Sequence, residues 1–103
     1  MPSATGEQMN AINRDSRAYW NKRAATFTRF ATGEYEHWLM DLLALNPGEE
    51  LLDMGCATGT LAVPLAHAGY RVHGCDFAEA MLAILEKRAA TENLPIISHL
   101  MAW

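Results

Sequence analysis

A glycine-rich turn and a carboxylate further along the chain have the residue types and spacing of a nucleoside-binding site. The turn is Gly55-Cys56-Ala57-Thr58-Gly59, and Asp76 follows it after about 20 residues. Glycine lets a ligand approach the backbone closely, and unpaired amides at a helix start donate hydrogen bonds to an anionic group. The Asp76 carboxylate can accept hydrogen bonds from both hydroxyls of a ribose. The pair therefore predicts a site for a cofactor that contains a nucleoside.

Asp53, two residues before the turn, discriminates between two classes of such cofactor. In nicotinamide dinucleotide sites the turn usually reads G-x-G-x-x-G and lies against a pyrophosphate, which a carboxylate at this position would repel. S-adenosylmethionine carries an ammonium, a carboxylate and a sulfonium, so an acid at the strand end is favourable for its ammonium. The residues favour S-adenosylmethionine, and a nicotinamide-dependent oxidoreductase stays open as an alternative.

The elements that must position these residues alternate along the chain. Short apolar runs indicate strands, and large residues at three-to-four spacing indicate helices. The order strand, helix, strand, helix, strand predicts an α/β fold with a partial Rossmann-like parallel sheet of about three strands, helices on the faces and two N-terminal helices. The expected strands are Leu51–Met54, Tyr70–Cys75 and Ile96 to about Met101, and the expected helices run from Asp15 or Ser16 to Phe30 and over Glu34–Leu45, Thr60–Ala68 and Glu79–Ala90.

The domain organisation is expected to be simple. Residues 1–14 are predicted to be a flexible N-terminus, and residues 15–103 a single domain. Within the helix after the glycine turn, Pro64 is expected to kink or loosen the early turns, and Gly69 to stop the helix.

Composition excludes several classes of function. The net charge of −4, with Lys and Arg scattered, argues against a nucleic-acid partner. The two cysteines, Cys56 and Cys75, form no CxxC motif and have no paired histidines beside them, so no metal site is expected. No apolar run approaches the roughly 18 residues that span a bilayer, which predicts no membrane insertion and a cytoplasmic location.

The two strand-and-turn segments are similar to a known family. Leu51–Gly59 and Val72–Leu82 resemble the first two motifs of class I S-adenosylmethionine-dependent methyltransferases. The resemblance implies S-adenosylmethionine as cofactor and methyl transfer to an acceptor, expected to be a small molecule, that the sequence does not identify. It also implies that Asp53, Gly55 and Gly59 shape the methionine end of the pocket, that Cys56 and Ala57 belong to the loop at the cofactor, that Asp76 holds the ribose and that Phe77 lies near the adenine.

One residue departs from the family pattern, and one helix follows it loosely. Ala57 stands where the family most often has glycine, and its methyl group restricts positive φ angles. The segment from Tyr19 to Ala25 resembles the N-terminal helix that packs over the cofactor in many members. Tyr19, Trp20 and Phe27 are nevertheless interpreted as helix-packing residues rather than ligand contacts, because aromatic side chains dominate burial.

The resemblance also implies that the chain is the cofactor-binding portion of an incomplete domain. The family's domain normally continues through further strands, so the first strand is expected to lie at an exposed sheet edge through which the chain self-associates. The chain alone is expected to be inactive, and its catalytic residues are unknown. A non-catalytic Rossmann-like interaction module stays open. The histidines are dispersed, and none is expected to act as a base: His37, His67, His73 and His99.

Overall fold

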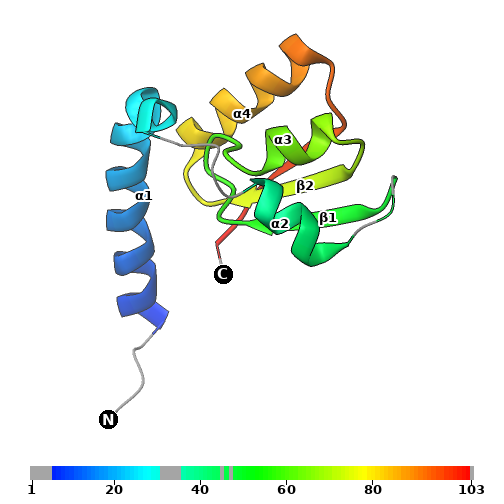
Figure 1. Cartoon of the computed structure of the whole chain (residues 1–103). Helices are drawn as coiled ribbons and strands as arrows, with labels where there is room; N and C mark the ends of the chain where they lie inside the picture. Colours follow the sequence, from blue (N-terminus) through cyan, green and yellow to red (C-terminus); the bar gives the residue numbers. More distant parts are fainter. Residues whose placement is uncertain (1–5, 31–35, 45, 47, 103) are drawn as a thin grey trace.

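Helices and strands alternate from the first strand onward. The structure is a computed structural model that describes residues 6–30, 36–44, 46 and 48–102. The elements are α1 Gly6–Phe30, α2 Glu36–Leu43, β1 Glu50–Met54, α3 Ala62–His67, β2 Arg71–Asp76, α4 Glu79–Glu92 and β3 Ile96–Leu100 (Figure 1).

The strands form one parallel sheet in the order β1-β2-β3. Leu52 of β1 lies opposite His73 of β2, which lies opposite Ile97 of β3. Because the strands are parallel, their carboxyl ends meet at one edge, where ligands bind in open α/β sheets. The ends of β1 and β2 carry Met54 and Asp76 to that edge. The prediction of an α/β fold with a parallel sheet of about three strands is confirmed.

Helices α3 and α4 pack on one face of the sheet. A strand order that advances in one direction through right-handed crossovers places both crossover helices on the same side. Leu51 and Ile96 point toward that side and join the core. Their neighbours Leu52 and Ile97 point the other way and are 63% and 56% exposed. The described helices therefore cover one face and leave the other open.

The core lies between these two helices and the sheet. Leu85 of α4 and Val72 of β2 are fully buried in one cluster with Leu65 of α3. Burial of each such side chain stabilises the fold by about 1.5–3 kcal/mol. The side chains expected from their helical spacing to face the sheet are Leu61, Ala62, Leu65, Ala66, Met81, Leu82 and Leu85. All of these are buried except Leu61, which is half-buried and packs against the core.

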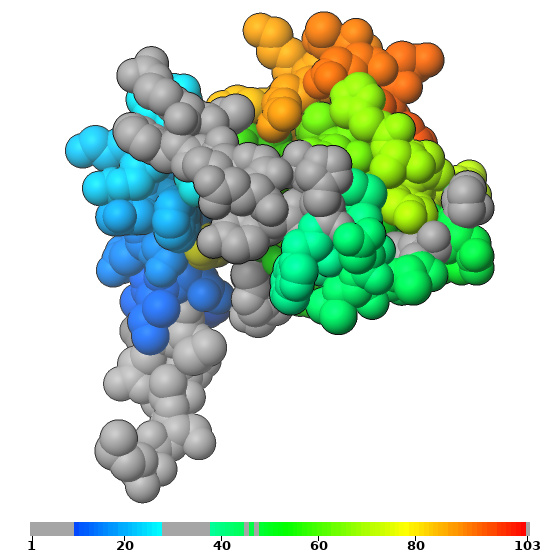
Figure 2. Space-filling model, in the orientation of Figure 1, coloured from blue at the N-terminus to red at the C-terminus, as the bar shows by residue number. Residues whose placement is uncertain are grey.

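Helix α1 is longer than predicted. It begins at Gly6 rather than at Asp15 or Ser16, so residues 6–14, predicted to be a flexible N-terminus, are helical. No proline or glycine occurs between positions 7 and 14 to interrupt the helix. The helix stands beside the start of α4 (Figure 1) and forms a column along that side of the molecule (Figure 2). Residues 1–5 lie outside the described residues.

Helix α3 is shorter than predicted. It begins at Ala62 instead of Thr60, because the turn continues through the preceding residues. Pro64 is the third residue of the helix, in the first turn, where the missing N–H removes no helical hydrogen bond. Gly69 takes a φ of 101° just after the helix, which agrees with its predicted role as the stop signal.

The remaining helix boundaries differ by a few residues. The predicted ends of α2, Glu34 and Leu45, lie outside the described residues, and Ala44 has a left-handed φ of 47° directly after the helix. Helix α4 extends past Ala90 to Glu92, and Asn93 ends it in the left-handed conformation. Asparagine tolerates that conformation, so it can replace glycine as a C-terminal cap.

Candidate functional site

The glycine turn is tied to the carboxyl end of β2. The backbone N–H groups of Gly55 and Cys56 both donate to the Cys75 carbonyl, at 2.7 and 2.9 Å. Three turn residues take positive φ, with 76° at Gly55, 51° at Ala57 and 97° at Gly59. For Ala57 this left-handed conformation costs roughly 1–2 kcal/mol. The methyl group at position 57 therefore does not prevent the turn from adopting the glycine-like conformation.

Asp76 joins the two loops that meet at this edge. Its Oδ2 accepts a hydrogen bond from the Ala57 N–H at 2.9 Å, and its Oδ1 accepts one from the Ala78 N–H at 3.0 Å. The residue is only 6% exposed. Each carboxylate oxygen has a second lone pair, so both can accept a further hydrogen bond from a ligand.

Asp53 brings a second carboxylate to the same region. It is half-buried and lies opposite Gly74 in the β1–β2 register. Burial raises the pKa of the Asp53 carboxyl above its ordinary value, and the negative charge of Asp76 raises it further. A cationic group placed beside this pair of acids would be attracted to both.

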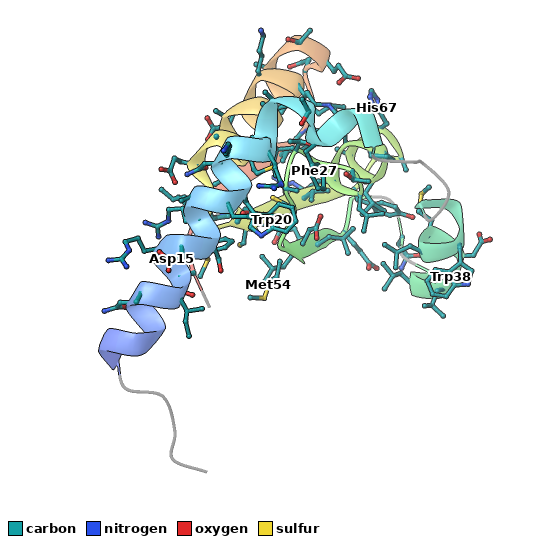
Figure 3. The ribbon with its side chains drawn as sticks, turned by 90° about the vertical axis from the view of Figure 1, so that its left-hand side faces the viewer. Asp15, Trp20, Phe27, Trp38, Met54 and His67 are labelled. Atoms are coloured by element: carbon teal, nitrogen blue, oxygen red, sulfur yellow. The ribbon has the colours of Figure 1, made fainter. Side chains whose placement is uncertain are left out.

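A cavity of about 240 Å³ opens beside Asp76. Trp20 and Phe27 of α1 contribute to its wall, with their rings edge to face and centroids 6.1 Å apart. Figure 3 shows both side chains reaching from α1 toward the body of the molecule. The full set of lining residues is Trp20, Phe27, Gly55, Ala57, Asp76, Phe77 and Met81.

The cavity includes part of the predicted site and adds residues that the sequence analysis assigned elsewhere. Trp20 and Phe27 are predicted to be packing residues. Phe27 does pack against the buried cluster of Ala24, Ala78 and Met81, and both aromatic residues also line the cavity. Their seven-residue separation, which is about two helical turns, could have indicated a shared helix face. Tyr19, the neighbouring aromatic residue, is 48% exposed and carries the Arg23 guanidinium over its ring.

Gly59, one of the predicted site residues, lies outside the cavity wall as described and has a packing role. A Cβ atom at Gly59 would lie 2.6 Å from Leu85 Cδ1 and 2.9 Å from Val63 Cγ2. The absence of a side chain therefore permits the close approach of the turn to α3 and α4. Asp53 likewise does not line this cavity.

Cys56 is buried behind the turn rather than presented to the cavity. It is 3% exposed, and a Cβ atom at Gly74 would lie 2.9 Å from its Sγ. Burial, followed by the charges of Asp53 and Asp76, raises the pKa of the Cys56 thiol to about 12. The thiol is therefore protonated at neutral pH and unsuited to act as a nucleophile. Gly74, which makes room for it, was not singled out by the sequence.

The structure brings histidines into two pairs that their spacing did not indicate. His67 Nε2 lies 2.7 Å from Glu92 Oε1. His73 Nδ1 lies 3.0 Å from His99 Nε2, with the two rings stacked. None of these three histidines lines the cavity, and His37 lies outside the side chains that are described.

No group of three or more His, Cys, Asp or Glu side chains within the described residues could hold a metal ion. Among the described helices, none combines the length and the apolar character needed to cross a membrane.

The chain is similar to known proteins over the turn and the sheet. The family model described as "Methyltransferase domain" matches residues 51–102. Human glycine N-methyltransferase is 36% identical over 55 residues, which cover 53% of this chain and 19% of that protein. Human glycine N-methyltransferase and three other curated relatives are all much longer than this chain, which spans only 19% to 28% of their length.

Solved structures show the same fold. TehB from Haemophilus influenzae superposes with a TM-score of 0.60 at 27% identity, over 75% of this chain and 27% of that one. Coclaurine N-methyltransferase, solved with N-methylheliamine and SAH, has a TM-score of 0.59 at 24% identity, over 67% of this chain and 22% of that one. At 24% identity, the similarity to coclaurine N-methyltransferase shows a shared fold and nothing more.

Proposed function

The chain belongs to the family of methyltransferase domains, whose cofactor is S-adenosylmethionine, and from this premise we propose that its cavity beside Asp76 holds the adenosyl part of that cofactor. When bound, the cofactor supplies an electrophilic methyl group on its sulfonium. Asp76 accepts hydrogen bonds from the ribose, and the aromatic wall that includes Phe77 contacts the adenine. The observation that carries this proposal is the nearly buried Asp76 carboxylate in a wall that is otherwise apolar and aromatic.

The size and chemistry of the cavity agree with this part of the cofactor. Ligand pockets usually measure about 300–1,000 Å³, and the cavity of about 240 Å³ is smaller, which suits a nucleoside better than a whole cofactor. Aromatic side chains offer flat apolar surfaces to a purine ring. The carboxylate of Asp76 retains the acceptor capacity that two ribose hydroxyls require.

The electrostatics favour S-adenosylmethionine over a dinucleotide. Two carboxylates, Asp53 and Asp76, stand near the turn, and the charge of Asp76 disfavours the ionisation of Asp53. A pyrophosphate would add negative charge to this region, whereas an ammonium and a sulfonium would neutralise it. We assign the ammonium to Asp53, with Gly55 on the methionine side. The N–H groups of Gly55, Cys56, Ala57 and Gly59 donate within the protein, so they are not assigned to the ligand. Cys56, Ala57 and Gly59 then act by shaping the turn.

We further propose that the acceptor is a small molecule and that the 103-residue chain alone binds the cofactor without transferring its methyl group. The name of one relative supports the first point, since the glycine that it names is a small molecule. Asp76 is the one ionisable side chain among the described residues lining the cavity. Its two oxygens already accept backbone hydrogen bonds, so it is poorly placed to deprotonate an acceptor.

The first test is isothermal titration of the chain with S-adenosylhomocysteine. Asp76→Asn keeps one acceptor oxygen for the backbone but removes the charge, and hydrogen bonds to a charged group contribute about 1.5–3 kcal/mol. We expect affinity to fall by roughly 10- to 100-fold, and to be lost in Asp76→Ala. Asp41→Asn, which changes an exposed acid of α2, is the matched control and should bind normally.

Two outcomes would support the alternatives instead. Binding of a nicotinamide dinucleotide without binding of S-adenosylhomocysteine would indicate an oxidoreductase fragment. Binding of neither ligand by a folded chain that forms a defined oligomer would indicate an interaction module.

Self-association through the free edge of β1 is a further proposal. In the described sheet β1 pairs only with β2, so its other edge presents unpaired backbone groups. A cytoplasmic location and the absence of a nucleic-acid partner stay predictions from composition.

A further inference from the structure

Asn21 of α1 caps the start of α4 across a long sequence separation. Its Oδ1 accepts a hydrogen bond from the Ala80 N–H at 2.9 Å, although the two residues are 59 positions apart. Ala80 lies in the first turn of α4, where backbone N–H groups have no partner within the helix. The N-cap residue, Ala78, provides no side-chain hydrogen bond. Asn21 therefore supplies from another helix the acceptor that a local cap would normally supply.

The Asn21 side chain also acts on Glu79, the residue before Ala80. The pKa of the Glu79 carboxyl lies below its ordinary value, first because of its own backbone N–H and then because of the Asn21 side chain. Asn21 is thus hydrogen-bonded to Ala80 and favours the ionised form of Glu79.

Arg17, one turn earlier in α1, makes a second connection to the same loop. Its Nε donates to the Phe77 carbonyl at 3.0 Å, and it lies 3.9 Å from the Glu79 carboxylate. Ala24, further along the same helix face, is 2% exposed and packs with Ala78 and Met81. These contacts form a stripe by which α1 docks on the β2–α4 loop.

The docking stripe lies beside the residues that close the cavity. Trp20 and Phe27 line the cavity, whereas Arg17 and Asn21 do not. Helix α1 packs chiefly against α4, and its position at the side of the molecule is visible in Figures 1 and 2. Any movement of α1 away from α4 would therefore remove both aromatic walls together.

We propose that Asn21, assisted by Arg17, is the latch that holds α1 against the β2–α4 loop and so sets how fast the nucleoside ligand leaves the cavity. This inference rests on the proposed function, since the ligand is the adenosyl group of the cofactor. Asn21 is a positioning residue, because it acts through the placement of Trp20 and Phe27. Loss of the Asn21 side chain should increase the rate of ligand release and leave the rate of ligand association nearly unchanged.

The test is a stopped-flow measurement of association and dissociation rates for S-adenosylhomocysteine, read from tryptophan fluorescence. Asn21→Ala should raise the dissociation rate by about fivefold, which corresponds to the roughly 1 kcal/mol that a helix cap contributes. Asn21→Asp keeps the acceptor for the Ala80 N–H but adds a negative charge near Glu79, so it should restore part of the slow release. Lys22→Ala, at an exposed position of the same helix, should release the ligand at the unsubstituted rate.

Two results would overturn the latch. One is an unchanged dissociation rate in Asn21→Ala, and the other is an equal increase in Lys22→Ala. If Asn21→Ala does not fold by circular dichroism, Arg17→Gln replaces it, and equal release rates for that variant and the unsubstituted chain would contradict the proposal. Failure of the unsubstituted chain to bind S-adenosylhomocysteine would instead reject the proposed function.

Hydrogen exchange gives an independent readout. Ligand should slow amide exchange over residues 17–27 in the unsubstituted chain and much less in Asn21→Ala. Equal protection in both would show that the ligand holds α1 without the latch.

Discussion

At the scale of single residues, Asp53 combines a cost for folding with a role in binding. An aspartate with a raised pKa in the folded chain stabilises the fold when protonated. That stabilisation is complete below the unfolded pKa, near 3.8, and is lost as the pH rises through the folded value. At pH 7, which lies above the unfolded pKa, the raised pKa of Asp53 therefore opposes folding, and its carboxylate is expected to be retained for the cofactor ammonium.

Asp53→Asn should accordingly raise the melting temperature at pH 7 and leave it unchanged at pH 3, where the carboxyl is protonated in both states. Circular dichroism melts at the two pH values check this, with the exposed Asp41→Asn as control. The same variant should weaken S-adenosylhomocysteine binding in titration calorimetry. Equal melting temperatures at pH 7 would contradict the assigned burial cost.

At the scale of elements, the turn at Gly59 determines how closely α3 and α4 pack. Gly59 and Gly69 have nearly the same φ angle, 97° and 101°. They differ in their surroundings, since a Cβ atom at Gly59 would lie 2.6 Å from Leu85 Cδ1 while one at Gly69 would have no atom within 4 Å. A comparison of alanine substitutions at the two positions therefore separates the cost of backbone strain from the cost of steric overlap.

Gly69→Ala should lower the free energy of unfolding by about 1 kcal/mol through backbone strain alone. Gly59→Ala should cost that amount plus about 1–3 kcal/mol for overpacking. Urea titrations of both variants measure the difference. Equal losses would mean that Leu85 and Val63 move aside without cost, and that Gly59 is needed for its φ angle only.

At the scale of the whole molecule, the open face and the free edge meet at β1. Parallel sheets are usually covered on both faces, yet Leu52 is 63% exposed on the face that the described helices leave open. Exposed apolar side chains next to unpaired backbone groups favour association with a second chain. Self-association, if it occurs, should therefore depend on β1.

Leu52→Lys should shift the chain toward its monomer mass of 11.4 kDa in sedimentation velocity at rising concentration, because a charge on this face opposes pairing. Leu42→Lys is the matched control, since Leu42 is 64% exposed on α2, away from the sheet. A monomeric unsubstituted chain, or equal effects of the two variants, would contradict association through β1.

The amino-acid sequence alone determined the strand, turn and helix around Gly55 and the acid at position 76, because these features depend on local periodicity and on turn chemistry. It also determined the parallel sheet, since alternating strands and helices allow few other arrangements. Helix ends were less accurate, as at Gly6 and Ala62, because no strong start signal marks them.

Only the tertiary structure decided which side chains surround the cavity. Trp20 and Phe27 reach it from a helix that docks through contacts spanning 59 and 60 positions, Asn21 to Ala80 and Arg17 to Phe77. Contacts over such separations leave no periodic pattern in the sequence. For the same reason the packing role of Gly59 became visible only when α4 was placed against the turn.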